Sequence, residues 1–479
     1  MSSSFRPALE RALSQALDHL EGLERAPVGA TASLAELRSR LARALPDEGL
    51  AAERVVDELV CDTRGGLLGS AGGRFFAWVI GGAVPAALAA DWLTSTWDQN
   101  SVLYACGPAV AVIEEICGAW LKELLGLPAD ASFALVTGCQ MAHVTCLAAA
   151  RHHLLAERGW DVECRGLGDA PRLRLLTSGE RHGTVDRAVR LLGLGTDCVQ
   201  ELAVDEAGRM LPGSLADALS ASASSPTIVL LQAGDINLGA YDPFDRLIPQ
   251  AHRRGAWVHV DGAFGLWAAV SDRYRHLLAG VESADSWATD GHKWLNVPFD
   301  SGYAFVRHPA AHRGSMSHRA SYLTHAADAR DQIDWSPEWS RRGRGVATYA
   351  AIRQLGRRGV ADMVQRCCVH AHSLVTGIAS LSGAEMGWEP QINQGLVRFL
   401  STAPAATEED HDRRTDEVIA AIQRDGEAFF GGTTWRGRRY MRVSVCNWQT
   451  SASDVARALA AVGQALGETL DSNGGASGG

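Results

Sequence analysis

Between about residues 80 and 345 the chain alternates short apolar runs with longer stretches of helical pattern, and this alternation constrains the fold more than any other feature. Residues 227–231 (Thr-Ile-Val-Leu-Leu) and 256–260 (Ala-Trp-Val-His-Val) are runs of the kind that form strands buried on both faces. Strands that alternate with helices pair into a mostly parallel sheet covered by helices. The sequence therefore predicts an α/β fold around such a sheet.

Two residues that follow apolar runs can do chemistry together. Asp261 comes directly after the run 256–260, and open α/β sheets bind ligands at the carboxyl ends of their strands. Lys293 stands in residues 285–294 (DSWATDGHKW). A lysine amine can form a Schiff base with an aldehyde, and pyridoxal phosphate needs such a lysine plus an acid at its pyridine nitrogen. The pair indicates a pyridoxal phosphate site, although a lone Lys is usually a solvated charge and a lone strand-end Asp is often a helix cap.

Two further turns also lie between an apolar run and a helical stretch and carry residues that could bind a ligand. His182 follows the apolar run 173–177 and precedes a helical stretch from Val185. Gly138 lies in residues 136–143, where small residues open a helix whose free backbone amides could hold a phosphate. We expect the four turns to converge on one ligand.

The order and separation of these elements resemble a known family. Gly138-Cys139-Gln140, His182, Asp261 and His292-Lys293 resemble the group II pyridoxal-phosphate-dependent amino acid decarboxylases, which include aromatic amino acid, histidine and glutamate decarboxylases. The resemblance extends over about residues 70 to 465. It implies the fold type I architecture of pyridoxal phosphate enzymes, with a seven-stranded type of central sheet, an N-terminal helical segment and a small C-terminal α/β domain.

The resemblance also implies a role for individual residues. By that likeness Lys293 holds the cofactor as an aldimine, Asp261 pairs with the pyridinium, His182 stacks on the ring and Ala263 packs against its other face. The residues expected around the phosphate are Gly138, Cys139, Gln140, Ser286, Asp290 and His292. Tyr322 resembles the loop tyrosine that returns a proton to Cα after carbon dioxide leaves; anchoring of a surface loop is the alternative.

Three departures from the family pattern concern substrate and rate rather than the cofactor. Cys139-Gln140 replaces a segment in which relatives often carry a hydroxyl. Ile236 stands where many relatives have a Thr near the cofactor's 3-hydroxyl. The basic turn at residues 340–345 lacks the Lys that commonly follows it.

The reaction that the resemblance implies is decarboxylation of an L-amino acid to its amine through a quinonoid intermediate. Trp78 falls where relatives build a pocket wall, and an apolar wall favours an aromatic or other hydrophobic substrate, although core packing explains a Trp equally well. Three alternatives stay open. They are another reaction on the same fold, such as aldehyde-forming oxidative deamination or a carbon–carbon lyase reaction, a non-catalytic homologue that binds the cofactor, and a purely structural dimer.

Composition restricts the partners and the compartment. The 479 residues, 46% of them hydrophobic, suffice for a main domain and a second one, and the net charge of -10 argues against binding to nucleic acid or an anionic membrane. The ten cysteines are scattered, which fits a reducing cytoplasm, and neither cysteines nor histidines show the spacing of metal ligands. The N-terminus lacks a signal-peptide core, and the uncharged stretch 75–90 is shorter than the roughly 18 residues of a membrane span.

The N-terminal segment predicts a partner subunit. Leu9, Leu13, Leu17 and Leu20 recur at helical spacing, and a second such pattern follows before residue 46. Because this apolar face is too large for so short a segment, we expect a homodimer with its active sites near the interface. The predicted organisation is a helical segment at 1–80, a large cofactor-binding domain at 81–345, a small domain at 346–470 and a flexible tail at 471–479.

Overall fold

The computed structural model describes residues 4–221, 225–318 and 329–474. The chain packs as two compact units. The larger unit comprises Gly81–Val369 and Pro390–Gln394, and the smaller comprises the described parts of Met1–Ile80, His370–Glu389 and Gly395–Gly479. Helix α12 (Gly345–Ala379) passes from one unit to the other and leaves helical geometry at Gly356. These two units are defined by how the chain packs. The predicted boundaries at residues 80, 345 and 470 are boundaries between domains that fold separately, and they stay a prediction.

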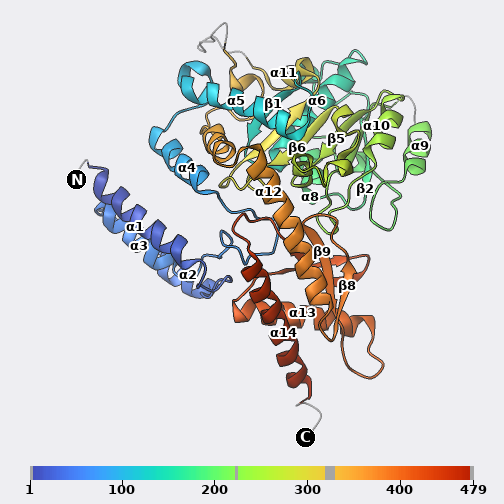
Figure 1. The fold of residues 1–479 in the computed structure, drawn as a ribbon. Helices are drawn as coiled ribbons and strands as arrows, with labels where there is room; N and C mark the ends of the chain where they lie inside the picture. Colours follow the sequence, from blue (N-terminus) through green and yellow to red (C-terminus); the bar gives the residue numbers. More distant parts are fainter. Residues whose placement is uncertain (1–3, 222–224, 319–328, 475–479) are drawn as a thin grey trace. The chain divides into compact units, whose positions relative to one another are not determined.

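The larger unit contains a seven-stranded sheet with the order β1-β7-β6-β5-β4-β2-β3 (Figure 1). Its strands are β1 (Ser132–Val136), β2 (Arg174–Ser178), β3 (Val199–Leu202), β4 (Thr227–Gln232), β5 (Trp257–Asp261), β6 (Ser286–Asp290) and β7 (Gly302–Val306). Strand β7 runs antiparallel to its neighbours β1 and β6, and the other neighbouring pairs are parallel. This arrangement confirms the predicted α/β fold with a mostly parallel sheet of seven strands.

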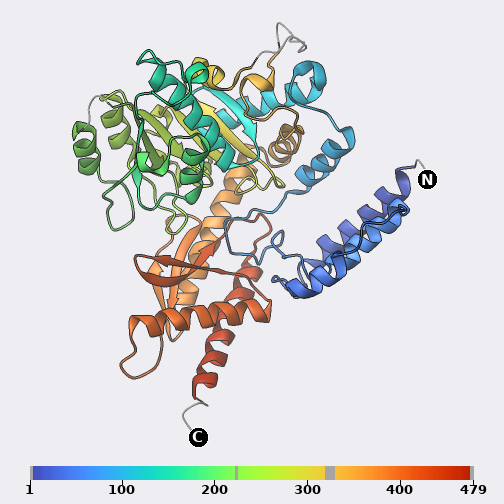
Figure 2. The same cartoon turned by 180° about the vertical axis from the view of Figure 1, so that it is seen from behind.

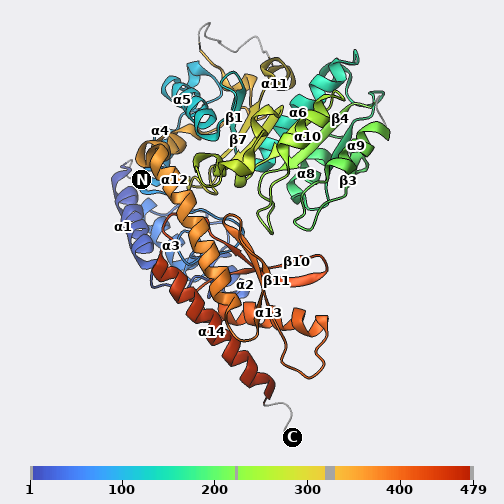
Figure 3. The same cartoon turned by 45° about the vertical axis from the view of Figure 1, so that its right-hand side comes forward.

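The larger unit also contains helices α4 (Pro85–Trp97), α5 (Pro108–Leu125), α6 (Cys139–Ala156), α7 (Val162–Arg165), α8 (Gly183–Leu191), α9 (Pro212–Ala221), α10 (Phe244–His252) and α11 (Pro309–Met316). Of these, α5, α6, α9 and α10 pack on the sheet. Helix α6 packs on β5, β6 and β7 and has α8 and α11 as helix neighbours, while α9 lies beside β3 and α10 (Figure 3). Among the helices of the described chain, none combines the length and the apolar character that crossing a membrane requires.

Burial on both faces explains why the strands read as continuous apolar runs. Every residue of β5 is buried, and successive side chains of a strand point to opposite faces of the sheet. Trp257 joins the apolar cluster that α6 forms with the sheet, so His259 and Asp261, at alternate positions, share that face. Val258 and Val260 point to the other face and are fully buried. Strand β5 therefore carries three polar or aromatic residues under α6.

The smaller unit combines both ends of the chain. Its helices are α1 (Arg6–Gly22), α2 (Leu34–Leu41), α3 (Ala52–Thr63), α13 (Glu408–Asp425) and α14 (Ala452–Gly474). A sheet of order β10-β11-β9-β8 is formed by β8 (Ala384–Trp388), β9 (Gln394–Phe399), β10 (Gly431–Trp435) and β11 (Arg438–Ser444). The pairs β8–β9 and β10–β11 are antiparallel, and α13 packs on β11 and on α14 (Figure 2).

A buried arginine holds the segment after α1 in the smaller unit. Arg74 is 3% exposed, and its Nη2 donates to the carbonyl oxygens of Leu23, Glu24 and Ala26 at 3.2, 2.9 and 2.9 Å. Helices α1, α2 and α3, by contrast, contain no buried residue. The N-terminal helices are thus anchored through the chain that follows α1 rather than through their own apolar faces.

Candidate active site

The candidate site lies where the parallel strands end. Asp261 is the last residue of β5 and Asp290 the last of β6, and β1 ends just before Gly138. Because β1, β5 and β6 run in the same direction, their carboxyl ends lie at one edge of the sheet. Lys293 follows β6 by three residues. The sequence-predicted residues Gly138, Asp261, Asp290 and Lys293 therefore meet at this edge.

Two glycines let the chain segments approach closely at this edge. A Cβ on Gly302, the first residue of β7, would lie 2.4 Å from Gly138 Cα. A Cβ on Gly138 would lie 3.1 Å from His292 Cε1 and 3.4 Å from Asp290 Oδ1. Hydrogen in place of a methyl group at these positions leaves room at the start of α6.

Lys293 carries the amine of the site. Its Nζ lies 3.2 Å from Asp290 Oδ2, and its side chain is 18% exposed. Burial by itself lowers the pKa of Lys293, but the carboxylates of Asp290 and Asp261 and the nearby Cys139 sulfur outweigh it, so the pKa is raised overall. The amine of the ligand-free protein is therefore an ammonium held by a carboxylate.

Few lysines in this sequence are available to form a Schiff base. The full sequence contains two lysines, Lys122 and Lys293. Lys122 Nζ donates to the backbone carbonyl oxygens of Ala129 and Ala131, between α5 and β1. Lys293 is thus the lysine that combines burial with a place at the strand ends.

Asp261 carries the buried acid of the site and is 6% exposed. Burial by itself raises the pKa of Asp261, but its interaction and hydrogen bond with His143, together with Lys293 and His182, lower it well below its usual range. The N–H of Ala263 donates to Oδ1 at 3.1 Å. Asp261 is therefore ionised, as an acid paired with a pyridinium nitrogen must be.

The start of α6 meets the end of β6. The N–H of Cys139 donates to Asp290 Oδ1 at 2.6 Å, and His292 Nε2 lies 3.6 Å from the same oxygen. His292 Nδ1 accepts from the N–H of Ser301 at 3.1 Å, and its ring stacks on Phe299 with centroids 4.4 Å apart. Burial lowers the pKa of His292, so the ring is neutral at physiological pH. Cys139, Asp290 and His292 form one connected group at the helix N-terminus.

His182 and Gln140 are joined through one residue of α8. His182 is the N-cap of that helix, and its Nδ1 accepts from the N–H of Thr184 at 3.3 Å. Gln140 Nε2 donates to the carbonyl oxygen of Thr184 at 3.2 Å. His182 is also near enough to contribute to the lowered pKa of Asp261. Both residues therefore belong to the group that the sequence predicts.

Ser286 is not brought to the phosphate end of the site. It is the first residue of β6, whereas Asp290 is the last, and four residues of strand span about 13 Å. Its Oγ instead accepts from Trp257 Nε1 at 2.9 Å and lies 2.9 Å from His259 Nδ1. The predicted place of Ser286 around the phosphate is thus corrected to a place deep in the sheet, because it lies at the other end of its strand.

Of two further predicted residues, one belongs to the other compact unit and one falls outside the described residues. Trp78 belongs to the smaller unit, where it packs against Phe75 and Phe429 with ring centroids 5.7 and 5.6 Å away and is 51% exposed. Tyr322 falls outside the described residues. Their roles in substrate binding and proton transfer stay predictions.

Two buried histidines behind Asp261 were missed by the sequence reasoning. His143, on α6, and His259, on β5, are both fully buried, and His143 Nδ1 lies 2.9 Å from His259 Nε2. His143 Nε2 faces Asp261 Oδ2 at 3.4 Å. Two spacings could have indicated them: Cys139 and His143 are one helical turn apart, and His259 and Asp261 alternate along one strand.

The same residues form a group that could hold a metal ion. The Sγ of Cys139, the imidazole of His143 and the carboxylate of Asp261 offer ligand atoms within 4.8 Å of one another. The expectation of no metal site rested on sequence spacing and did not include this combination of a helix and a strand end. Because Asp261 is also the acid that a pyridine nitrogen requires, an ion and the cofactor would compete for it.

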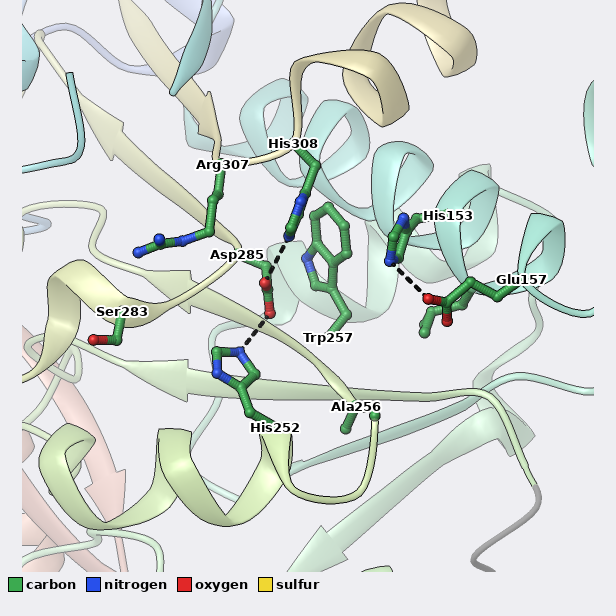
Figure 4. Close-up of a pocket in the computed structure, with 11 residues that line it drawn as sticks. His153, Glu157, His252, Ala256, Trp257, Ser283, Asp285, Arg307 and His308 are labelled. Carbon is green, nitrogen blue, oxygen red and sulfur yellow. Dashed lines mark hydrogen bonds and ion pairs between the residues drawn. The ribbon is translucent and has the colours of Figure 1, made fainter. Parts of the chain in front are cut away.

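A pocket of about 490 Å³ lies at the opposite edge of the sheet from the candidate site (Figure 4). Asp285, which directly precedes β6, accepts hydrogen bonds from His252 and His308, one on each carboxylate oxygen at 2.9 Å. His153 points toward Glu157, with Nε2 and Oε1 3.4 Å apart. These groups pair with one another at the edge of the sheet that is remote from Lys293.

The residues at the carboxyl edge fit pyridoxal phosphate. Lys293 supplies the amine for the aldehyde and ionised Asp261 the partner for the ring nitrogen. The N-terminal end of α6, which favours an anion, lies at the same edge, in a cradle that a Cβ on Gly138 would fill; in the ligand-free protein its first amide, the N–H of Cys139, donates to Asp290. The donor set thus matches each polar end of the cofactor.

Comparison with known proteins gives relatives among the amino acid decarboxylases. L-2,4-diaminobutyrate decarboxylase of Rhizobium meliloti is 28% identical over 394 residues, which cover 81% of this chain and 76% of that protein. Human cysteine sulfinic acid decarboxylase is 28% identical over 405 residues, 80% of each chain. The crystal structure of Oryza sativa TDC with PLP and tryptamine superposes with a TM-score of 0.91 at 24% identity, over 98% of this chain and 99% of that one, and this likeness shows the fold.

The family follows from the match over most of the chain. Residues 36–401 match the pyridoxal-dependent decarboxylase conserved domain. The predicted family, the fold type, the cofactor and the class of enzyme, a carboxy-lyase, are thereby confirmed. The chain belongs to the pyridoxal-phosphate-dependent amino acid decarboxylases.

Proposed function

We propose that the protein decarboxylates a free L-amino acid with an aromatic or other hydrophobic side chain, releasing the amine and carbon dioxide. The observation that carries this proposal is the convergence of Lys293, Asp261 and the start of α6 at one edge of the sheet. Pyridoxal phosphate, when bound, supplies an electron sink for the bond that breaks at Cα of the substrate.

Each site residue of the chain is assigned its own role in the proposed reaction. Lys293 would hold pyridoxal phosphate through its amine, and the cofactor would supply the aldehyde that takes up the amine of the substrate. Asp261, ionised in the ligand-free protein, would keep a proton on the ring nitrogen. His182 would orient the substrate carboxylate, and Tyr322 would give a proton to Cα. The last two roles rest on the positions of these residues in the sequence.

An apolar substrate is supported by the aromatic residues of the segment before Gly81. Trp78 is 51% exposed and has a φ of 55°, a conformation that is uncommon for a residue with a bulky side chain. Phe75 and Phe429 hold its ring from within the smaller unit. An exposed indole held in this way is suited to contact an aromatic or aliphatic group. The competing substrates are amino acids with a cationic or an acidic side chain. The names of two relatives, a diaminobutyrate decarboxylase and a cysteine sulfinic acid decarboxylase, state substrates of these two kinds.

The proposed assembly is a homodimer, and the proposed compartment is the cytoplasm. Four leucines on α1 are between 38% and 54% exposed: Leu9, Leu13, Leu17 and Leu20. A stripe of this kind on a helix without buried residues is suited to pack against a second copy. The ten cysteines are free thiols, which fits a reducing compartment.

A screen of the cofactor-loaded enzyme against the common amino acids tests the proposal. Carbon dioxide, amine, aldehyde and hydrogen peroxide are measured in the same reactions. We expect equal amounts of amine and carbon dioxide from one or more aromatic or hydrophobic amino acids, and a loss of at least about 10³-fold in Lys293→Ala. Lys122→Arg is the matched control, because it changes the other lysine and leaves the site intact.

Other products would select other reactions on the same fold. Aldehyde and hydrogen peroxide in place of amine would indicate oxidative deamination. Aldehyde formed without oxygen consumption from a hydroxylated substrate would indicate carbon–carbon cleavage. Turnover restricted to acidic or cationic amino acids would overturn the substrate class and leave the decarboxylase assignment in place. A cofactor-loaded protein without any turnover would support the non-catalytic alternative.

A further inference from the structure

A buried chain of polar side chains runs behind the acid of the site. His143 Nε2 lies 3.4 Å from Asp261 Oδ2, and His143 Nδ1 lies 2.9 Å from His259 Nε2. His259 Nδ1 lies 2.9 Å from Ser286 Oγ, which accepts from Trp257 Nε1 at 2.9 Å. His143, His259 and Ser286 are fully buried. This row of side chains therefore connects Asp261 to the interior of the sheet without exposure to solvent.

The fold builds this chain from three elements. Trp257, His259 and Asp261 occupy alternate positions of β5 and share one face. His259 pairs with Ser286 in the register of β5 and β6. Helix α6 crosses that face and places His143 over the strand, where its ring meets the ring of His259 edge to face at 5.2 Å.

The two ends of this row of side chains fix the direction of its hydrogen bonds. An indole N–H can only donate, so Ser286 Oγ accepts from Trp257, and the hydroxyl can still either donate to His259 Nδ1 or accept from it. The ionised carboxylate of Asp261 at the other end can only accept, which selects the orientation in which Ser286 donates to His259. Burial lowers the pKa of His259 to about 3, so its ring is neutral and its single proton lies on Nε2. That proton is donated to His143 Nδ1, which leaves the His143 proton on Nε2, facing Asp261.

The opposite orientation is unfavourable. It would point the lone pair of His143 Nε2 at the carboxylate of Asp261, which is repulsive in a buried place. His143 Nε2 is buried and has no other hydrogen-bond partner among the described residues. The Nε2 proton of His143 is therefore directed at Asp261.

We propose that His143 is a positioning residue that acts through Asp261, holding the carboxylate ionised and aimed at the ring nitrogen of the cofactor, and that His259 fixes the tautomer of His143. The inference rests on the proposed function, because it assigns both histidines to the same cofactor site. It concerns cofactor binding, so it can be tested without knowledge of the substrate.

The direct test is cofactor affinity in two variants of one residue. His143→Asn keeps a polar atom near His259 but is too short to reach Asp261, whereas His143→Gln places an N–H close to the position of Nε2. Apo-enzyme is titrated with pyridoxal phosphate and followed by visible absorbance. We expect His143→Asn to weaken binding about tenfold or more and His143→Gln to restore most of it. His312→Asn, at another fully buried histidine of the larger unit, is the matched control.

A cofactor analogue separates positioning from a merely structural role. The 1-deaza analogue of pyridoxal phosphate has carbon in place of the ring nitrogen, so Asp261 has no nitrogen to hold. We expect wild type and His143→Asn to bind this analogue equally. Equal weakening for analogue and cofactor would show that His143 only supports the structure and would overturn the proposal, as would unchanged affinity for pyridoxal phosphate in His143→Asn.

A variant of the second histidine keeps the test valid if His143→Asn does not fold. We expect His259→Asn to weaken pyridoxal phosphate binding by a smaller factor in the same direction, and the double variant to bind no more weakly than His143→Asn alone. Additive losses would contradict action of His259 through His143. Failure of the wild-type protein to bind pyridoxal phosphate is a different result, because it would overturn the proposed function itself.

Discussion

At the scale of single residues, the site pairs each reactive group with an opposite charge before the cofactor enters. Lys293 is held by Asp290 at 3.2 Å, and Asp261 is kept ionised by His143, Lys293 and His182 despite its burial. A buried charge without a partner would be costly, so these pairs also preserve the charge states that the chemistry needs.

The residue that protonates Cα decides which product leaves. If Tyr322 is the proton donor, Tyr322→Phe should lower amine formation by about 10²- to 10⁴-fold. In air, carbon dioxide release should continue, with the carbon skeleton leaving as an aldehyde together with ammonia and hydrogen peroxide. Quantifying amine and aldehyde from one reaction checks this. Tyr349→Phe, a ring that stacks on Trp120 at 5.0 Å, should leave the product ratio unchanged. An unchanged ratio in Tyr322→Phe would assign the proton to another group.

The sequence could identify Lys293 and Asp261 because each lies at or shortly after the carboxyl end of a strand and the two complement one cofactor. The spacing of His143 from Cys139 places it on one face of a helix but does not reveal its partner His259, which lies 116 residues away and on a different kind of element. Ser286 was assigned to the phosphate by its place in the family pattern, but the direction of β6 puts it at the other end of the strand. Proximity across elements is the information that a linear pattern lacks.

At the scale of elements, the turn between β1 and α6 depends on a glycine in β7. A methyl group on Gly302 would lie 2.4 Å from Gly138 Cα, so β7 or the turn before α6 must shift. We expect Gly302→Ala to destabilise the protein by about 1–3 kcal/mol in chemical unfolding and to weaken cofactor binding. Gly213→Ala, in α9 with open space around the added Cβ, is the control and should have no cost. Full stability of Gly302→Ala would contradict the close approach of β7 and the turn.

The leucines of α1 test the proposed dimer. Leu13 and Leu17 are each 47% exposed in the described chain. Two glutamates there would place charges in an apolar interface, so Leu13→Glu/Leu17→Glu should weaken dimerisation by at least about 30-fold. Sedimentation velocity across a concentration series measures this. Leu191→Glu, at a 62% exposed leucine of α8, should sediment as wild type. A dimer in the double variant as tight as wild type would exclude α1 from the interface.

The elements themselves were largely predictable. The runs at 227–231 and 256–260 became β4 and β5 because burial on both faces requires apolar residues at every position. The antiparallel direction of β7 was not predictable, since its residues read like those of the parallel strands and only the pairing with β1 and β6 distinguishes it.

At the scale of the whole molecule, buried neutral histidines link stability to pH. Burial lowers the pKa values of His259 and His312 to about 3, below the usual value of about 6.5 for an exposed histidine. A lowered pKa in the folded state contributes stability that is present above about pH 6.5 and is lost as pH falls toward 3. Each histidine should cost about 1.4 kcal/mol per pH unit in this window.

Urea unfolding at neutral pH and at about pH 5 measures this dependence. His312→Asn should unfold more readily at neutral pH but lose less stability on acidification than wild type. His312 lies 2.9 Å from Ser132 Oγ and 2.8 Å from the carbonyl oxygen of Trp335, so its loss removes both contacts. The same loss of stability on acidification in variant and wild type would contradict a neutral buried His312.

The central claim is that Lys293 carries the cofactor. Borohydride reduction of the holoenzyme fixes a Schiff base irreversibly, and peptide mapping by mass spectrometry then locates the pyridoxyl group. The chain contains two lysines, and Lys122 is bonded to the carbonyl oxygens of Ala129 and Ala131. We predict that the group is found on Lys293, in the peptide that follows β6. A pyridoxyl group on Lys122, or none on either lysine, would contradict the account.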